Sequence, residues 1–122
     1  MSVRAIRGAI DVEANTAEAI GAATRRLLAA MCLANGLETP GVISAFFTMT
    51  TDLTAAYPAA SARALGWTDV PLLDAQEIDV PTAMPRVIRV LLHVETDRAR
   101  RDIQHVYLGG AVALRPDLHQ ER

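Results

Sequence analysis

Short apolar runs of strand length recur along the chain. They cover residues 3 to 10, 42 to 50, 70 to 73 and 86 to 95. Turn residues and prolines bound these runs, and β-branched or aromatic side chains are common in the second and the fourth, which is typical of buried strands. After residue 97 the pattern weakens and predicts a helical turn at 98 to 103 and a short strand at 105 to 108.

Two segments between these runs have helical spacing. Apolar side chains recur every three or four residues from 19 to 31, Asn15 or Thr16 can cap the start, and Asn35-Gly36 marks the end. Tyr57-Pro58 opens a shorter helix that stops at Gly66. The order β-α-β-α-β-β predicts an α+β fold, in which helices pack on one sheet.

Composition narrows the class of protein. The chain has 122 residues, 51% of them apolar, which fits one domain over 1–122 whose core subunit association could complete. We expect a flexible tail from about residue 116. No run approaches the roughly 20 apolar residues of a membrane span, and the N-terminus lacks a signal-peptide pattern, so the expected location is cytoplasmic. A net charge of -2 gives no electrostatic reason to expect nucleic acid or an anionic membrane as partner.

Two arginines are notable for their positions. Arg7 and Arg89 fall in the middle of runs predicted to be buried strands, and all twelve Lys and Arg positions are Arg, so only placement is informative. Burying an unpaired charge costs several kcal/mol, and arginine does not lose its proton, so both side chains need an anionic partner. That partner is either a carboxylate of the protein, from Glu77, Asp79 or Glu95, or a carboxylate of a ligand.

The motif search is mostly negative. Neither G-x-G-x-x-G nor a P-loop is present, His93, His105 and His119 are too scattered for a metal site, and no serine has an obvious His/Asp pairing. We expect His93 to be hydrogen-bonded within its strand and Cys32 to fill the core. No metal and no cofactor are predicted. The remaining arginines, a glutamate and a tyrosine suit the binding of a small polyanion by bidentate hydrogen bonds.

Short segments in a fixed order along nearly the whole chain resemble one known family. The segments are Ile6-Arg7-Gly8-Ala9, Asp52-Leu53, Tyr57-Pro58-Ala59, Arg63, Val70-Pro71, Gln76-Glu77, Ile88-Arg89-Val90, His105-Val106-Tyr107-Leu108 and Leu114-Arg115-Pro116-Asp117-Leu118. They resemble chorismate mutase of the small trimeric α/β class, as opposed to the all-helical class. Each fragment is weak alone, and the order and separations of all of them carry the resemblance.

The resemblance implies a fold and a reaction. It implies a mixed sheet with helices on one face, related to the ferredoxin-like arrangement, and a homotrimer whose sheets form a pseudo α/β barrel with active sites between subunits. The reaction is the intramolecular Claisen rearrangement of chorismate to prephenate in aromatic amino acid biosynthesis, which needs no nucleophile or cofactor. The enzyme must then hold the dianion in a compact conformer and meet the charge that develops on the ether oxygen with a fixed donor.

The resemblance also implies roles for individual residues. Arg89 would donate to the ether oxygen and to a carboxylate, Arg7 and Tyr107 would hold a carboxylate, and Glu77 would accept from the ring hydroxyl. The other expected substrate contacts are Tyr57, Ala59 and Arg63 from the adjacent subunit, Leu72 and Leu73 as apolar wall of the first subunit, and Leu114 and Arg115 closing over the site.

Asp74 departs from the family pattern, in which the matching position commonly carries a small neutral Cys or Ser facing the substrate. A carboxylate beside Glu77 and a dianion should repel both, unless its pKa rises or an arginine compensates. We therefore expect Asp74→Ser to raise kcat/KM at neutral pH.

Two readings from other classes stay open. One is a non-catalytic trimer that binds chorismate-like acids, in which Asp74 has compromised the chemistry. The other is a small trimeric deaminase of enamine or imine acids, which also uses arginines to bind substrate carboxylates.

Overall fold

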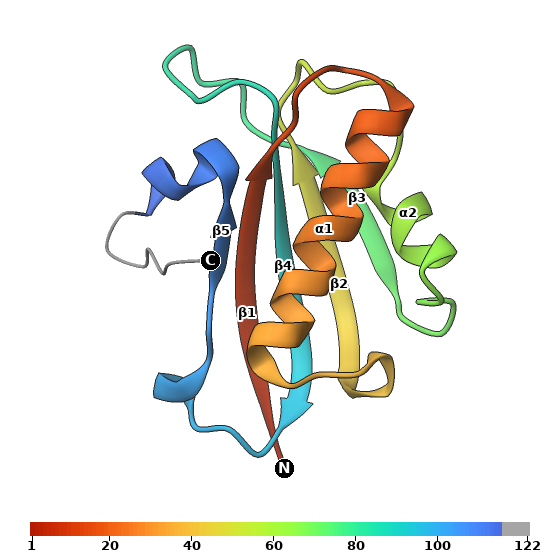
Figure 1. Ribbon diagram of the computed structural model, residues 1–122, viewed down its shortest axis with the longest axis vertical. Helices are drawn as coiled ribbons and strands as arrows, with labels where there is room; N and C mark the ends of the chain where they lie inside the picture. Colours follow the sequence, from red (N-terminus) through yellow and green to blue (C-terminus); the bar gives the residue numbers. More distant parts are fainter. Residues whose placement is uncertain (116–122) are drawn as a thin grey trace.

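In the computed structural model, which describes residues 1–115, one five-stranded mixed sheet carries helices on one face (Figure 1). The strands are β1 (Ser2–Asp11), β2 (Val42–Met49), β3 (Leu72–Gln76), β4 (Val87–Thr96) and β5 (Val106–Leu108). The helices are α1 (Ala17–Asn35) and α2 (Pro58–Ala64), with short 3-10 turns η1 (Thr39–Gly41), η2 (Arg100–Asp102) and η3 (Gly109–Leu114). The predicted α+β class, the mixed sheet and the placement of helices on one face are confirmed.

The long strands form the centre of the sheet. The order is β3-β2-β4-β1-β5; β4 pairs antiparallel with both β1 and β2, and the two short edge strands pair in parallel. The predicted order of elements is confirmed, and β5 extends it by the short strand expected at 105 to 108. The expected tail from about residue 116 lies outside the described residues.

Helix α1 covers the middle of the sheet. The Thr16 hydroxyl accepts from the Ala19 N–H at 3.1 Å, and Gly36 ends the helix with φ 61, a left-handed conformation that glycine adopts without strain. The large apolar side chains of the helix, Ile20, Leu27, Leu28 and Met31, are fully buried in the main core, and Ala19 and Ala23 are partly buried against it. At Gly8 the approach is so close that a Cβ would lie 2.5 Å from the sulfur of Met31, so any larger residue there would force the Met31 side chain to move. Within residues 1–115, no helix combines the length and the apolarity that crossing a membrane requires.

The third strand differs from its prediction. The sequence pattern placed it at 70 to 73, whereas β3 spans Leu72–Gln76. Its second half, Asp74-Ala75-Gln76, has low strand propensity, and it is held in the sheet by parallel pairing with β2, from Ala45↔Leu72 to Met49↔Gln76. Neighbouring strands, which a local pattern does not reveal, therefore set the bounds of this edge strand.

The two faces of the sheet have different surroundings. Ile6 and Leu92 form a register pair that points to the helices and is fully buried, whereas the next pair, Arg7 and Leu91, points to the opposite face. On that opposite face, η3 covers a small cluster of Ala9, Val87 and Tyr107, on which Ala111 packs, and Met84 from the segment before β4 packs against the same cluster. We call the uncovered remainder, which carries Arg7, Phe46, Arg89 and Leu91, the open face.

The expectation that Arg7 and Arg89 are buried is therefore wrong for the single chain. Arg7 is exposed, and the side chain of Arg89 is 42% exposed. The two strands are indeed in the centre of the sheet, but both arginines point to the face that α1 and α2 leave open. Strand periodicity identifies which residues share a face, whereas long-range packing decides which face is covered.

Candidate active site

The open face contains a hollow of about 470 Å³ in the middle of the sheet. The side chains and backbone that line it come from four strands and from Arg115, which follows η3: Arg7, Gly8, Phe46, Thr48, Arg89, Val90, Leu91, Tyr107 and Arg115. Sheet register brings them together, because Ala9 pairs with both Arg89 and Tyr107, and Arg89 also pairs with Thr48. Three arginines and no acidic side chain are among these lining residues, so the hollow favours an anionic ligand.

Arg89 is fixed in this hollow by Glu77, which follows β3. Its Nε donates to Glu77 Oε1 at 3.2 Å and to Oε2 at 3.1 Å, and the glutamate side chain is only 16% exposed. The Glu77 backbone N–H donates to Met49 O at 2.8 Å, which continues the ladder beyond β3 and anchors the residue. The ion pair that the sequence left open for Arg89 therefore forms with Glu77.

The terminal nitrogens of Arg89 remain available. Within residues 1–115 its side chain donates hydrogen bonds only from Nε. Both terminal nitrogens can therefore form the planar fork that suits a carboxylate or an oxyanion. The pair with Glu77 thus orients the guanidinium without using its strongest anion-binding edge.

Thr48 is a site residue that the sequence reasoning missed. Its hydroxyl donates to Glu77 Oε2 at 2.7 Å, and the residue lines the hollow. A threonine within an apolar strand is unremarkable in the sequence. Only the register between β2 and β4, which places it opposite Arg89, distinguishes it from its neighbours.

Arg7 is held through its backbone. The parallel ladder between β1 and β5 ends at Gly8↔Val106, and the Arg7 N–H donates to Nδ1 of His105 at 3.0 Å, which adds one further hydrogen bond. Burial lowers the pKa of His105, and the charges of Arg7 and Arg115 lower this pKa further. The imidazole is therefore kept neutral, the form whose Nδ1 can accept a hydrogen bond.

Five of the predicted site residues thus meet at the hollow: Arg7, Glu77, Arg89, Tyr107 and Arg115. Tyr107 is 9% exposed and packs in the small cluster under η3, against which Leu114 also packs. This cluster ties the end of η3 to the hollow.

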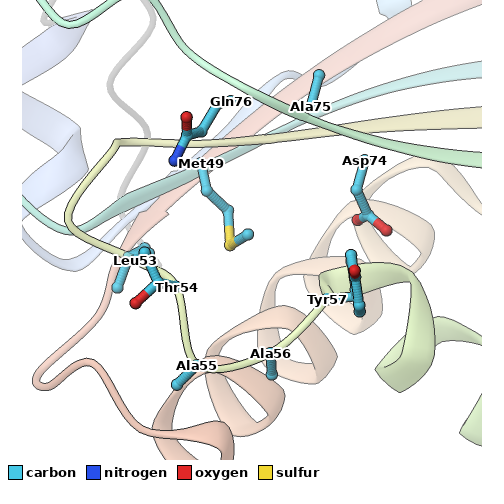
Figure 2. A pocket seen from close by; sticks show the side chains of 9 residues that line it. All are labelled: Met49, Leu53, Thr54, Ala55, Ala56, Tyr57, Asp74, Ala75 and Gln76. Atoms are coloured by element: carbon cyan, nitrogen blue, oxygen red, sulfur yellow. The ribbon is translucent and has the colours of Figure 1, made fainter.

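A second group of predicted residues lies around the edge strand β3 and α2. Here a pocket of about 420 Å³ is lined by Met49, Leu53, Thr54, Ala55, Ala56, Tyr57, Asp74, Ala75 and Gln76 (Figure 2). It shares no lining residue with the hollow of the open face. Tyr57 is 69% exposed, and Arg63 is also exposed, on α2. In the single chain, this group and the arginine hollow are separate.

Asp74 connects β3 to α2. Its Oδ1 accepts from the Ala59 N–H at 3.1 Å, and Tyr57, at the helix N-cap, offers no side-chain cap of its own. Burial raises the pKa of Asp74, while the bond from Ala59 and the charge of Arg63 act to lower this pKa. An arginine thus partly compensates the carboxylate, one of the outcomes that the sequence allowed.

The expected position of Asp74 beside Glu77 is wrong within one chain. Asp74 pairs with Phe47, whose side chain faces the helices, whereas Glu77 is bonded to Thr48 on the open face. The two carboxylates therefore point to opposite sides of the sheet.

Leu72 and Leu73 also point to opposite faces. Leu73 pairs with Phe46 on the open face and is 56% exposed, next to the hollow. Leu72 pairs with Ala45 and packs against the main core. Of the two predicted wall residues, only Leu73 has an orientation that suits the role.

The remaining candidates have local roles. His93 Nδ1 lies 3.0 Å from the Ser44 hydroxyl, which confirms that it is hydrogen-bonded within the sheet. Cys32 is half-buried against the core, and burial raises the pKa of its thiol, as expected for a core-filling residue. In the described part of the chain, no three His, Cys, Asp or Glu residues are grouped so that they could hold a metal ion.

Comparisons with known proteins agree with one another. The model of the family described as chorismate mutase type I matches residues 3–118. The chain is 54% identical to chorismate mutase AroH of Thermus thermophilus, over 95% of this chain and 96% of that protein, and 41% identical to chorismate mutase AroH of Bacillus subtilis, over 97% and 94%. The solved structure of a chorismate mutase from Clostridium thermocellum superposes with a TM-score of 0.89 at 51% identity and covers 90% of this chain and 98% of that one.

Proposed function

Since the chain belongs to the chorismate mutase type I family and is an enzyme of that type, an isomerase, we propose that it converts chorismate to prephenate in the hollow of the open face. The reaction is an intramolecular rearrangement, so the protein has to supply geometry and electrostatics rather than a nucleophile. The observation that carries this assignment is the Arg89 guanidinium, oriented by Glu77 with both terminal nitrogens available to an anion.

In this proposal Arg89 meets the charge that develops in the reaction. As the C–O bond of the ether breaks, negative charge accumulates on its oxygen, and a preorganised donor in a partly buried site stabilises that charge. The Arg89 side chain is 42% exposed and its guanidinium is held from Nε, so it needs little reorganisation when the charge appears. A terminal nitrogen donates to the ether oxygen, and its neighbour can donate to a carboxylate of the substrate.

The other residues of the hollow bind and fold the substrate. Arg7 and Tyr107 hold a carboxylate, and Glu77 accepts from the ring hydroxyl. Arg115, at the end of η3, adds a third cation, and Leu114 beside it closes the apolar side. Fixing both ends of the flexible dianion selects its compact conformer, which lowers the entropic part of the barrier.

We further propose that the site is completed by a neighbouring copy in a homotrimer, which contributes Tyr57, Ala59 and Arg63. Support comes from the open face, where Val3 is 59% exposed, Phe46 42% and Leu73 56%, a group of apolar side chains that association would remove from water. The second pocket, with Tyr57 and Asp74, would then lie in the part of one chain that meets the hollow of the next. The cytoplasmic location expected from the sequence stays a prediction.

The test is a turnover assay on the wild type, Arg89→Ala and Arg89→Lys, following chorismate loss and prephenate formation together. Arg89→Ala should lower kcat/KM by about 100-fold to 1000-fold, or roughly 3 to 4 kcal/mol of barrier, because one preorganised donor is lost. Lysine should not restore the rate, since it lacks the fork. Arg26→Ala, on the exposed side of α1, is the matched control and should keep full activity.

Other outcomes would point to the readings that the sequence left open. Binding of chorismate without turnover would indicate a non-catalytic binder, and activity only on enamine or imine acids would indicate a deaminase. The mass of the same samples in solution tests the shared site, because a stable, active monomer would contradict it.

A further inference from the structure

Thr48 contacts Glu77 where the glutamate meets Arg89. Its hydroxyl lies 2.7 Å from Glu77 Oε2, and an ionised carboxylate can only accept, so the hydroxyl donates. Arg89 Nε lies 3.1 Å from Oε2 and 3.2 Å from Oε1. The arginine therefore contacts both oxygens almost equally and does not distinguish between them.

We propose that Thr48 is a positioning residue that decides which oxygen of Glu77 is presented to the substrate. The inference rests on the proposed function and deepens it. Within residues 1–115, Oε2 accepts from both Thr48 and Arg89, which uses its two lone pairs, whereas Oε1 accepts only the longer bond from Arg89. Oε1 is thus the oxygen that retains capacity to accept the ring hydroxyl of the substrate.

The backbone of Thr48 makes this selection rigid. The residue lies in β2 between two hydrogen-bonded neighbours, with Ala75 of β3 on one side and Arg89 of β4 on the other. Its β-branched side chain has few χ1 rotamers, so the position of the hydroxyl is fixed by the strand. Glu77, by contrast, follows the end of β3 and has three rotatable side-chain bonds, and therefore gains most from an external anchor.

The anchor predicts a specific dependence on the substrate hydroxyl. Without the Thr48 hydroxyl, the Glu77 carboxylate can rotate about its last side-chain bond while keeping its pair with Arg89. The oxygen that accepts from the substrate hydroxyl is then no longer held in one orientation. Loss of the anchor should therefore impair substrates that carry the ring hydroxyl and leave analogues without it unaffected. A merely structural role of Thr48 would impair both equally.

The experiment compares Thr48→Val, which keeps the shape and removes the hydroxyl, with Thr48→Ser, which keeps the hydroxyl. For chorismate, Thr48→Val should lower kcat/KM roughly 10-fold to 100-fold, the usual weight of one hydrogen bond to a charged group, mainly through kcat. Thr48→Ser should restore the rate to within about 3-fold. For a chorismate analogue that lacks the ring hydroxyl, wild type and Thr48→Val should have the same kcat/KM.

Ser44→Ala is the matched control. Ser44 lies on the same strand and the same face, and its hydroxyl contacts His93 outside the hollow, so its removal should leave turnover unchanged. Thermal unfolding of every variant checks that the sheet is intact.

Two results would overturn the inference. The first is a Thr48→Val variant that matches the wild type on chorismate. The second is a Thr48→Val variant that loses the same factor in kcat/KM on chorismate and on the analogue without the hydroxyl. If the wild type turns over chorismate and Thr48→Val is unimpaired, the inference about Thr48 is refuted while the proposed function stands. A wild type that fails to turn over chorismate would refute the proposed function, and the inference with it.

Discussion

The two faces of the sheet differ although the same strands build both. On the covered face Ile6, Phe47 and Leu92 are at most 1% exposed and make the core with α1. On the open face their immediate neighbours Arg7 and Phe46 are exposed, and they lie at the hollow that we propose as the active site. Adjacent residues of one strand can therefore carry stability and chemistry separately, because successive side chains point to opposite sides.

Leu91 and Leu92 provide the largest test of this separation. Leu92→Ala should lower the free energy of unfolding by about 2 to 5 kcal/mol, because it removes a fully buried side chain and leaves a cavity. Leu91→Ala, at the half-buried lining of the hollow, should cost about 1 kcal/mol. Denaturant unfolding measures both free energies. Relative to the stability that each variant loses, Leu91→Ala should lose more turnover than Leu92→Ala.

Equal losses of stability in these two variants would break the comparison. If copies of the chain associate through the open face, the loss for Leu91→Ala should shrink on dilution, because the interface contributes less to stability as the copies dissociate, whereas the loss for Leu92→Ala should be the same at every concentration. The concentration series therefore separates a core contact from a contact between subunits.

Much of the fold could be predicted from local sequence. The helix between Thr16 and Gly36 has a cap, a periodic apolar stripe and a stop signal, and all three are confirmed in α1. The strands at β1, β2 and β4 were also predicted, since their patterns are long. The bounds of β3 were wrong, because its polar half is strand only through pairing with β2.

The site was predictable only in part. The family resemblance pointed to Arg7, Arg89 and Tyr107, and the register of four strands brings them to one hollow. The exposure of Arg7 was not predictable, because no local pattern tells which face the helices cover. The contact of Thr48 with Glu77 depends on register between strands, and so it has no signature in the sequence.

Asp74 provides a smaller test on the face of the sheet that the helices cover, where we expect its role to be stability. Its carboxylate caps the Ala59 N–H at the start of α2, a helix whose N-cap residue supplies no acceptor. Asp74→Ala should therefore lower the free energy of unfolding by about 1 kcal/mol, whereas Asp74→Asn, which keeps an acceptor, should lose less. Thermal and denaturant unfolding at neutral pH measure the difference.

The same geometry reverses the effect that the sequence predicted for Asp74→Ser. Serine is too short to reach the Ala59 N–H from β3 in the same way, so the segment that carries Tyr57 and Arg63 should become less well fixed. We now expect kcat/KM to fall rather than rise in this variant. A rise in kcat/KM would show that repulsion of the substrate by the carboxylate outweighs its capping of α2.

His105 provides the smallest test, on the side of the open face. Burial lowers the pKa of His105, with Arg7 and Arg115 acting in the same direction, while the unfolded chain has the ordinary histidine pKa of about 6.5. The unfolded state therefore binds more protons between these two pKa values, so this part of the stability is complete above about pH 6.5 and is lost as pH falls toward the lowered pKa. His105→Gln cannot be protonated and its amide oxygen offers an acceptor to the Arg7 N–H, so its free energy of unfolding should decline less between pH 7.5 and pH 5 than that of the wild type. Denaturant unfolding at both values measures the difference in slope, and identical slopes would mean that the hydrogen bond to Arg7 does not depend on the neutral imidazole.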